Sequence, residues 1–234
     1  MEEFFGFFLD PYNEAKWYNI LLEFVAAAFG VLSVVFAKKE NIWVYPTGII
    51  STLLYVYLLY RWQLYGDLII NIYYTFMSIY GWYMWSKIID SKQIHLKISK
   101  SSKSDYIKST AIFIFTSIFV IIVYRHFAIM PIEMDFSASI NYFWEHFTSG
   151  KLLEFKKITP YLDTFTTGAA FSAMWLMANK KLESWIFWIS VNIVSVPLYF
   201  VKGYGFTGIQ YIIFLILAVF GYISWKKSLK HLRD

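Results

Sequence analysis

Four aromatic or polar side chains interrupt one long apolar run of the chain, residues 184–201. Trp185, Trp188, Asn192 and Tyr199 are spaced so that, at about 100° per residue, they fall within about 60° of one another on a helix. Two flat indole rings, an amide with two donors and one acceptor, and a phenol then share one face. These groups suit a planar aromatic ligand that has polar edges. The spacing therefore predicts a binding stripe on this helix.

Trp185 and Asn192 in this stripe also have a structural explanation. Trp185 lies near the end of the run, where indoles anchor helices to lipid headgroups, and Asn192 by itself can hydrogen-bond to a neighbouring helix. Trp188 lies about one turn deeper, so headgroup anchoring explains it less well. Because an unpaired amide in hydrocarbon is costly, Asn192 must face either protein or a water-filled cavity.

A second polar stripe lies on the run 66–85. Five of its residues share one face within about 80° of helical rotation: Asp67, Asn71, Tyr74, Ser78 and Trp82. Gln210, in the last apolar run, supplies a second amide that we pair with Asn71. We predict that Asn71 and Gln210 close the ligand pocket, with Tyr74 and Asp67 beside them.

The chain shows no pattern that predicts catalysis or metal binding. It has no cysteine, which excludes thiolate chemistry, and its four histidines lie in or beside loops. There is no HExxH pair, Walker loop or GxSxG elbow. The acids Glu23, Asp67 and Asp163 form no obvious proton relay, and capping, pairing or packing is an alternative role for Glu23 and Asp67. We expect no catalytic residue, metal, cofactor or nucleic-acid partner. Two functions other than ligand transport are kept as lesser alternatives, namely an intramembrane enzyme and a non-transporting scaffold.

Helices that lie in a membrane must position these side chains. Of the 234 residues, 58% are hydrophobic and 22% are aromatic, which is more than a soluble domain needs to fill its core. An all-α membrane protein with seven transmembrane helices is the fold that we predict, although the fourth run is short and the fifth is polar at its start. The seven runs are 17–37, 43–60, 66–85, 110–124, 161–178, 184–201 and 206–225.

Two parts of the chain resemble each other. The first reads Trp43, Tyr65-Gly66, Asn71, Gly81 and Trp85, and the second reads Trp185, Tyr204-Gly205, Gln210, Gly221 and Trp225. We interpret helices one to three and five to seven as duplicate units, which helix four brings into the same orientation. The result is a 3+1+3 arrangement of parallel repeats, with a site between them. The chain then divides into a tail and first repeat (1–86), a basic loop, linker helix and outer loop (87–160), and a second repeat with its tail (161–234).

Basic residues indicate the orientation in the membrane. Of the 21 Lys and Arg residues, 14 fall on one side of the predicted helices and the other 7 on the opposite side. The positive-inside tendency therefore places the N-terminus outside and the C-terminus in the cytoplasm, with 86–108 as a basic cytoplasmic loop. The acidic N-terminal segment shows no removable signal peptide. In the outer loop, 127–160, the amphipathic stretch SINYFWEHF suits the membrane interface.

These motifs resemble a known transporter family. The stretch ESWIFWISVN is similar to the Glu-x-Trp-x-x-Trp-x-x-x-Asn signature of the PnuC transporters of nicotinamide riboside, which here falls on Glu183, Trp185, Trp188 and Asn192. The ending IYGWYMW at 79–85 resembles the third helix of that family. The resemblance implies a SWEET-like 3+1+3 fold in the bacterial inner membrane. It also implies import of a vitamin precursor by facilitated diffusion, with phosphorylation by a cytoplasmic kinase trapping the substrate.

The resemblance and the residues together lead to one expected function. We predict a nicotinamide riboside uniporter whose pocket uses Trp185, Trp188 and Asn192, with the helix-three residues and Gln210 around them. Relatives can carry Asn where this chain has Ser51, so thiamine or another vitamin precursor is the alternative cargo. The expected partners are the substrate and the lipid bilayer. Functional dependence on a kinase is expected as well, and assembly into a homo-oligomer is left open.

Overall fold

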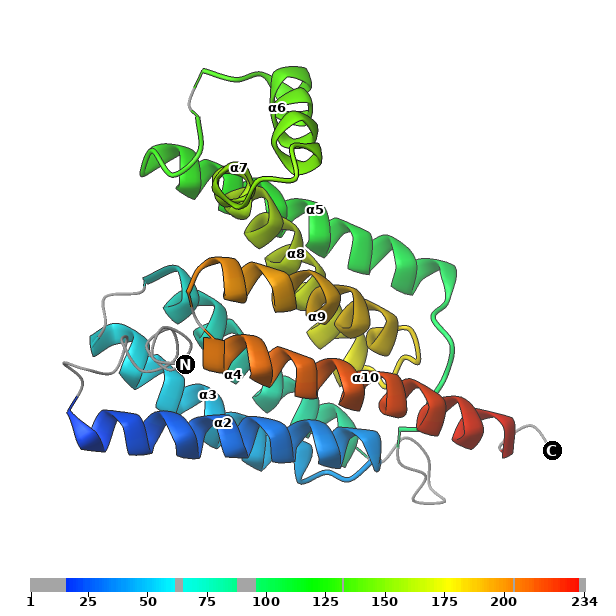
Figure 1. Cartoon of the computed structure of the whole chain (residues 1–234). Helices are drawn as coiled ribbons and strands as arrows, with labels where there is room; N and C mark the ends of the chain where they lie inside the picture. Colours follow the sequence, from blue (N-terminus) through cyan, green and yellow to red (C-terminus); the bar gives the residue numbers. More distant parts are fainter. Residues whose placement is uncertain (1–15, 62–64, 88–95, 132, 204, 232–234) are drawn as a thin grey trace.

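The computed structural model describes residues 16–61, 65–87, 96–131, 133–203 and 205–231, and within them the regular elements are helices joined by turns and short loops. The predicted N-terminal tail, residues 88–95 of the basic loop and Tyr204 of the sequence repeat lie outside the described residues. The described helices, shown in Figure 1, are α2 (Trp17–Lys38), α3 (Val44–Arg61), α4 (Tyr65–Ser86), α5 (Lys103–His126), α6 (Phe136–Thr148), α7 (Leu152–Lys157), α8 (Thr159–Ala178), α9 (Ser184–Val201) and α10 (Gly205–His231).

The apolar runs predict the long helices well, with two clear errors: α10 continues to His231, beyond the expected end at residue 225, and α5 starts earlier than expected. The bounds of α9 are those expected, whereas α5 begins at Lys103 and not near residue 110. A capping box explains the difference: the Ser102 hydroxyl accepts the backbone N–H of Asp105, and the Asp105 carboxylate accepts the backbone N–H of Ser102. Hydropathy misses this start because the first two turns of α5 are polar.

Four of the helices are long and apolar enough to cross a membrane by composition alone, namely α2, α5, α9 and α10. Helix α8 is less apolar than these four helices. It packs against α4, α5 and α9, so protein covers much of its surface. Its buried residues include Gly168, Ala169, Ala170, Ser172 and Ala173. Small residues let neighbouring helices approach closely, so a helix inside a bundle needs fewer bulky apolar side chains than a helix that faces lipid.

The long helices pack as a closed ring. In each half, the helices contact their neighbours in chain order, α2 with α3 with α4 and α8 with α9 with α10. Contacts of α4 with α8 and of α10 with α2 join the two halves, while α5 lies outside the ring against α8. Figure 1 shows α2 and α10 side by side, with the C-terminal ends of both at the same end of the bundle.

The two halves make matching contacts at a constant spacing of 140 residues. Trp85 Nε1 donates to the carbonyl oxygen of Met177 at 3.3 Å, and Trp225 Nε1 donates to that of Ala37 at 2.9 Å. The turns that follow these two carbonyls each place a non-glycine residue at positive φ, Glu40 in one half and Lys180 in the other. The three pairs 85/225, 37/177 and 40/180 all have the same separation.

This spacing corrects the register that the sequence resemblance suggested. Trp185 is pressed against Gly221 in the way that Tyr45 is pressed against Gly81, so the counterpart of Trp185 is Tyr45 and not Trp43. Since α4 and α10 run without interruption, the same spacing pairs Asn71 with Tyr211, and the pairing of Asn71 with Gln210 was wrong by one residue. A slip of one residue rotates a side chain by about 100° around a helix axis. Matching of residue letters does not detect such a rotation.

Two short helices connect α5 to α8. The carboxylate of Asp135 accepts the Ala138 backbone N–H at 2.7 Å and so caps the start of α6, which contains the amphipathic stretch recognised in the sequence. Ring nitrogen Nε2 of His146 lies 3.3 Å from the Glu154 carboxylate and joins α6 to α7. Trp144 remains 55% exposed on α6. The placement of α6 at a membrane interface stays a prediction.

Candidate substrate site

Two of the predicted site residues meet where α4 contacts α8 and α9. The rings of Tyr74 and Trp188 lie edge to face, with centroids 6.3 Å apart. Phe171 of α8 approaches Tyr74 at 6.4 Å and stacks on Tyr73 at 3.6 Å. The Tyr73 hydroxyl donates to the backbone carbonyl of Phe171 at 3.0 Å, which holds this stack in place. Four aromatic rings from three helices therefore form one group, of which the sequence analysis predicted only Tyr74 and Trp188.

Asn192 lies one turn along α9 from Trp188 and is almost fully buried, with 4% of its surface exposed. Its amide is not one of the fully enclosed polar atoms that lack a partner in the described part of the chain. An amide this deep in a helix bundle needs a partner, which protein, water or a ligand can supply. Contact of Asn192 with a ligand stays a prediction.

Gln210 lies on the other side of the ring, among α2, α3 and α10. The Tyr55 hydroxyl donates to its side-chain oxygen at 3.5 Å, which is long for such a bond. Nearby, the Ser51 hydroxyl donates to the Ala26 carbonyl at 2.7 Å and lies close to Gly30. The Ser51 hydroxyl thus already has a protein partner in this packing.

The polar residues of α4 are only partly connected to this group. The side-chain nitrogen of Asn71 donates to the Asp67 backbone carbonyl within the same helix at 2.9 Å, while Asp67 itself is exposed. Asp163 forms an ion pair with Lys202 at 2.6 Å, which links α8 to the end of α9. The ion pair with Lys202 therefore gives the Asp163 carboxylate a structural role at this position.

Trp185 does not join the group around Trp188. Only 1% of its surface is exposed, and its ring lies edge to face with Trp225 at 5.5 Å. Gly221 leaves room for this ring, because a Cβ at that position would lie 2.5 Å from the indole. Trp188 contacts Tyr74 and also packs against the buried cluster that contains Trp185, so it lies between the aromatic group and that end of the bundle. The Trp185 indole nitrogen is buried and has no partner among the described residues.

The glutamate of the sequence signature has a role that sequence reasoning missed. The Glu183 carboxylate accepts the backbone N–H and the hydroxyl of Ser101, both at 2.7 Å. Backbone hydrogen bonds from Ser99 to Lys180 and from Leu182 to Ser99 run alongside. Glu183 therefore fastens the segment before α5 to the start of α9. The Ser102–Asp105 pattern marks the start of α5, but it does not reveal this partner.

Lys180 carries an electrostatic signature at the same end. Burial lowers the pKa of its amino group, and the nearby Glu40 carboxylate opposes this effect. The Lys180 amino group lies 4.3 Å from the centroid of the Trp85 ring, within the range of cation–π attraction. The aromatic face and the carboxylate, both from the other half of the chain, thus offset part of the cost of burying this positive charge.

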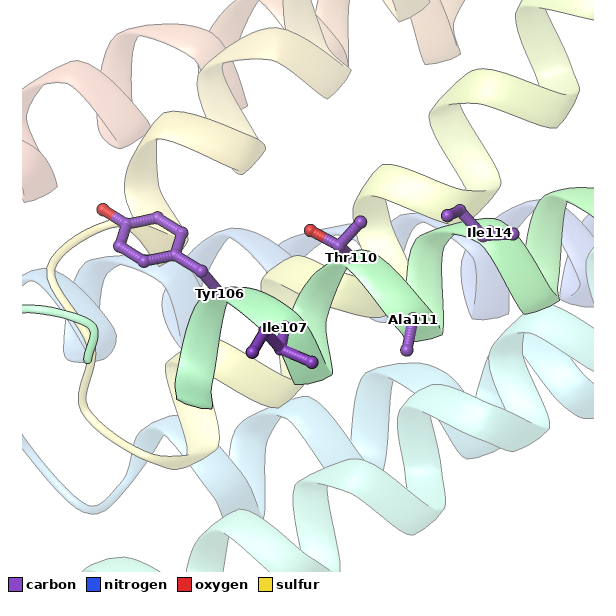
Figure 2. Close-up of a pocket in the computed structure, with 5 residues that line it drawn as sticks. All are labelled: Tyr106, Ile107, Thr110, Ala111 and Ile114. Carbon is purple, nitrogen blue, oxygen red and sulfur yellow. The ribbon is translucent and has the colours of Figure 1, made fainter. Parts of the chain in front are cut away.

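A shallow depression on α5 has a volume of about 400 Å³. Figure 2 shows its lining residues along the helix, and they are Tyr106, Ile107, Thr110, Ala111 and Ile114. It contains none of the predicted ligand-binding residues, and its surface is mostly apolar. Such a surface does not suit a vitamin precursor with several hydroxyl groups.

Comparisons with known proteins establish the family. The family model described as nicotinamide mononucleotide transporter matches residues 20–227, nearly the whole chain. The chain belongs to this family. It is therefore a transporter homologue and a multi-pass membrane protein, as its apolar helices also indicate.

Among its relatives, the nicotinamide riboside transporter PnuC of Neisseria mucosa is 29% identical over 226 residues, which cover 94% of this chain and 75% of the relative. PnuC of Escherichia coli is 23% identical and covers 88% of this chain and 85% of its own. The riboflavin/roseoflavin transporter RibM of Streptomyces davaonensis is 22% identical, with coverages of 87% and 83%. A crystal structure of the vitamin B3 transporter PnuC matches with a TM-score of 0.60 and 27% identity, over 94% of this chain and 85% of that one.

Proposed function

We propose that the protein imports nicotinamide riboside across the bacterial inner membrane. The single observation that carries the proposal is the arrangement on α9: Trp188 against Tyr74, with the buried side chain of Asn192 one turn away. Membership of the family and the printed substrate of two relatives agree with it.

The chemistry of the riboside matches these groups. Its pyridinium ring is flat and cationic, so stacking on Trp188 gains cation–π attraction of about 0.5–2 kcal/mol. Asn192 offers both donors and an acceptor to the carboxamide, while Gln210, Asn71 and Asp67 offer partners to the ribose hydroxyls. The set contains no Lys or Arg, which favours the riboside over a phosphorylated nucleotide.

For the membrane arrangement, we propose seven crossings in the 3+1+3 order, with repeats in 1–86 and 161–234 and a connecting region in 87–160. The closed ring of six helices and the contacts repeated at a spacing of 140 residues support this division. The two basic turns at 38–39 and 180–181 belong to these repeated contacts and so lie at one end of the bundle. The positive-inside tendency makes that end cytoplasmic and places the N-terminus outside.

For the mechanism, we propose uniport by rocking of one repeat against the other around a central site. The sequence has no nucleotide-binding motif and its intramembrane acids form no obvious proton relay, so we propose that the substrate gradient itself drives uptake. Phosphorylation by a cytoplasmic kinase then keeps that gradient inward. The protein acts as a carrier and not as an enzyme.

A binding and uptake experiment tests the cargo. Purified protein is titrated with nicotinamide riboside, thiamine, riboflavin and the mononucleotide, and proteoliposomes that contain only this protein are assayed for uptake. We expect the riboside to bind most tightly and to be taken up. Tight thiamine or riboflavin binding without a response to the riboside contradicts the assignment, and an absence of any uptake returns the protein to the scaffold alternative.

A further inference from the structure

Four aromatic rings form a row across the end of the bundle that holds the basic turns. Neighbouring centroids are 5.1 Å apart from Tyr45 to Trp85, 6.0 Å from Trp85 to Trp225, and 5.5 Å from Trp225 to Trp185. The exposed fractions are 3%, 4%, 0% and 1% in the order Tyr45, Trp85, Trp225, Trp185. The row passes from the first half of the chain to the second between Trp85 and Trp225. It therefore closes this end of the ring with a packed layer of buried rings.

The two central tryptophans each hold the opposite half. Trp85 of α4 donates to the Met177 carbonyl of α8, and Trp225 of α10 donates to the Ala37 carbonyl of α2. Each carbonyl also accepts a backbone N–H from the positive-φ residue of its own turn, at 3.0 Å in both cases. A carbonyl oxygen has two lone pairs, so one serves the turn and the other serves the tryptophan from the other half. These two bonds cross the boundary along which the halves must separate.

The two outer rings have the opposite character. The Tyr45 hydroxyl and the Trp185 indole nitrogen are buried and have no hydrogen-bond partner among the described residues. A buried polar group without a partner regains a hydrogen bond when water reaches it. Two hydrogen bonds across the boundary thus stabilise the closed layer, and two buried polar groups without partners destabilise it. Such opposing contributions keep the closed and the open arrangement close in free energy, as expected of an element with two states.

We propose that Tyr45, Trp85, Trp185 and Trp225 form the cytoplasmic gate of the transporter, closed in this structure, with the indole N–H groups of Trp85 and Trp225 as its latches. The proposal rests on the proposed function for the orientation and for the cargo that passes. Opening breaks both latches and separates the Trp85 and Trp225 rings. The Tyr45 hydroxyl and the Trp185 N–H become hydrated at the same time.

A single-cysteine reporter tests the gate without any substrate. The chain has no cysteine, so Ala218→Cys provides one reactive thiol within the same buried cluster, at a position 1% exposed. Inside-out vesicles are treated with a membrane-impermeant maleimide, and the labelling rate is measured. Trp85→Phe and Trp225→Phe keep most of the ring and remove the latch, so each should raise the rate about fivefold, the effect of one ordinary hydrogen bond.

Tyr45→Phe should change the labelling rate in the opposite direction to the tryptophan variants. It removes an unpaired hydroxyl from the closed state and should lower the labelling rate about fivefold. Trp43→Phe is the matched control, because Trp43 is 59% exposed beside the same turn, and its rate should equal that of the reporter alone. Gel filtration and thermal melting verify folding. If a tryptophan variant fails to fold, Tyr45→Phe still tests the gate, because it keeps the aromatic ring and removes only the hydroxyl.

Equal rates for all variants, or a Tyr45→Phe effect in the same direction as the tryptophan effects, overturn the latch mechanism. Labelling that follows the expected pattern only in right-side-out vesicles overturns the cytoplasmic placement instead. Because no substrate is present, neither result depends on the cargo assignment, which the binding titration decides by itself.

Discussion

Replacing Trp188 by alanine should weaken binding of nicotinamide riboside by more than about tenfold, which is about 1.4 kcal/mol. The Trp188 ring is supported from one side by Tyr74 and packs against Ala169, Ala170 and Val191, so it is held in one orientation before the ligand arrives. Loss of a stacked, desolvated indole removes both apolar contact and cation–π attraction, and this loss is typical of an aromatic anchor at a binding site. Asn192→Leu should weaken binding to a similar extent, because the buried amide then no longer meets the carboxamide.

The assay must separate lost binding from lost packing. Phe187 contacts the same small cluster from the neighbouring position of α9, so Phe187→Leu measures the cost of disturbed packing alone and should leave affinity within about threefold. Calorimetric titration is preferred to fluorescence for Trp188→Ala, since the substitution removes one of the ten tryptophans that give the signal. If Trp188→Ala and Asn192→Leu both bind the riboside as tightly as the unchanged protein, the aromatic group on α9 has only a structural role. If Phe187→Leu loses as much affinity as Trp188→Ala, the effect arises from packing.

Three further outcomes follow from the structure. Gly221→Ala should lower the free energy of unfolding by about 1–3 kcal/mol, because its Cβ would lie 2.5 Å from the Trp185 ring. Gly30→Ala should lower that free energy less, because its Cβ would lie 3.1 Å from the Ser51 hydroxyl. Equal melting temperatures for the two variants contradict this prediction. Burial lowers the pKa of Lys180 in the folded protein below its value of 10.5 in the unfolded chain. Between the folded and the unfolded pKa the unfolded chain binds more protons, so the stability of the fold should rise as pH increases through that interval. Lys180→Met should remove that rise and raise the melting temperature at neutral pH; lower stability at every pH would show that its attraction to Trp85 dominates. Counterflow of the riboside in proteoliposomes should persist when proton and sodium gradients are collapsed, and accumulation that follows either gradient excludes uniport.

The sequence by itself was sufficient for the approximate positions of the long helices and for the family. Hydropathy is a property of consecutive residues, so the bounds of α9 and the approximate positions of the other long helices could be read without a structure. The motif from Glu183 to Asn192 likewise indicated the family that the comparisons establish. The start of α5 was misplaced because its first turns are stabilised by the local bonds between Ser102 and Asp105, which hydropathy does not measure.

Only the tertiary structure decided which residues share a site. Trp185 and Trp188 lie on one face of α9 and were expected to act together, and the structure shows which ring each one meets: Trp225 for Trp185 and Tyr74 for Trp188. Tyr73 and Phe171, which stack beside Tyr74, are far apart in the chain and gave no local signal. The reason is physical: the helical period fixes the direction of a side chain around its own axis, whereas the ring that meets it at a given depth depends on how neighbouring helices slide and rotate against one another. The crossing bonds of Trp85 and Trp225 therefore became visible only when the two halves were placed side by side.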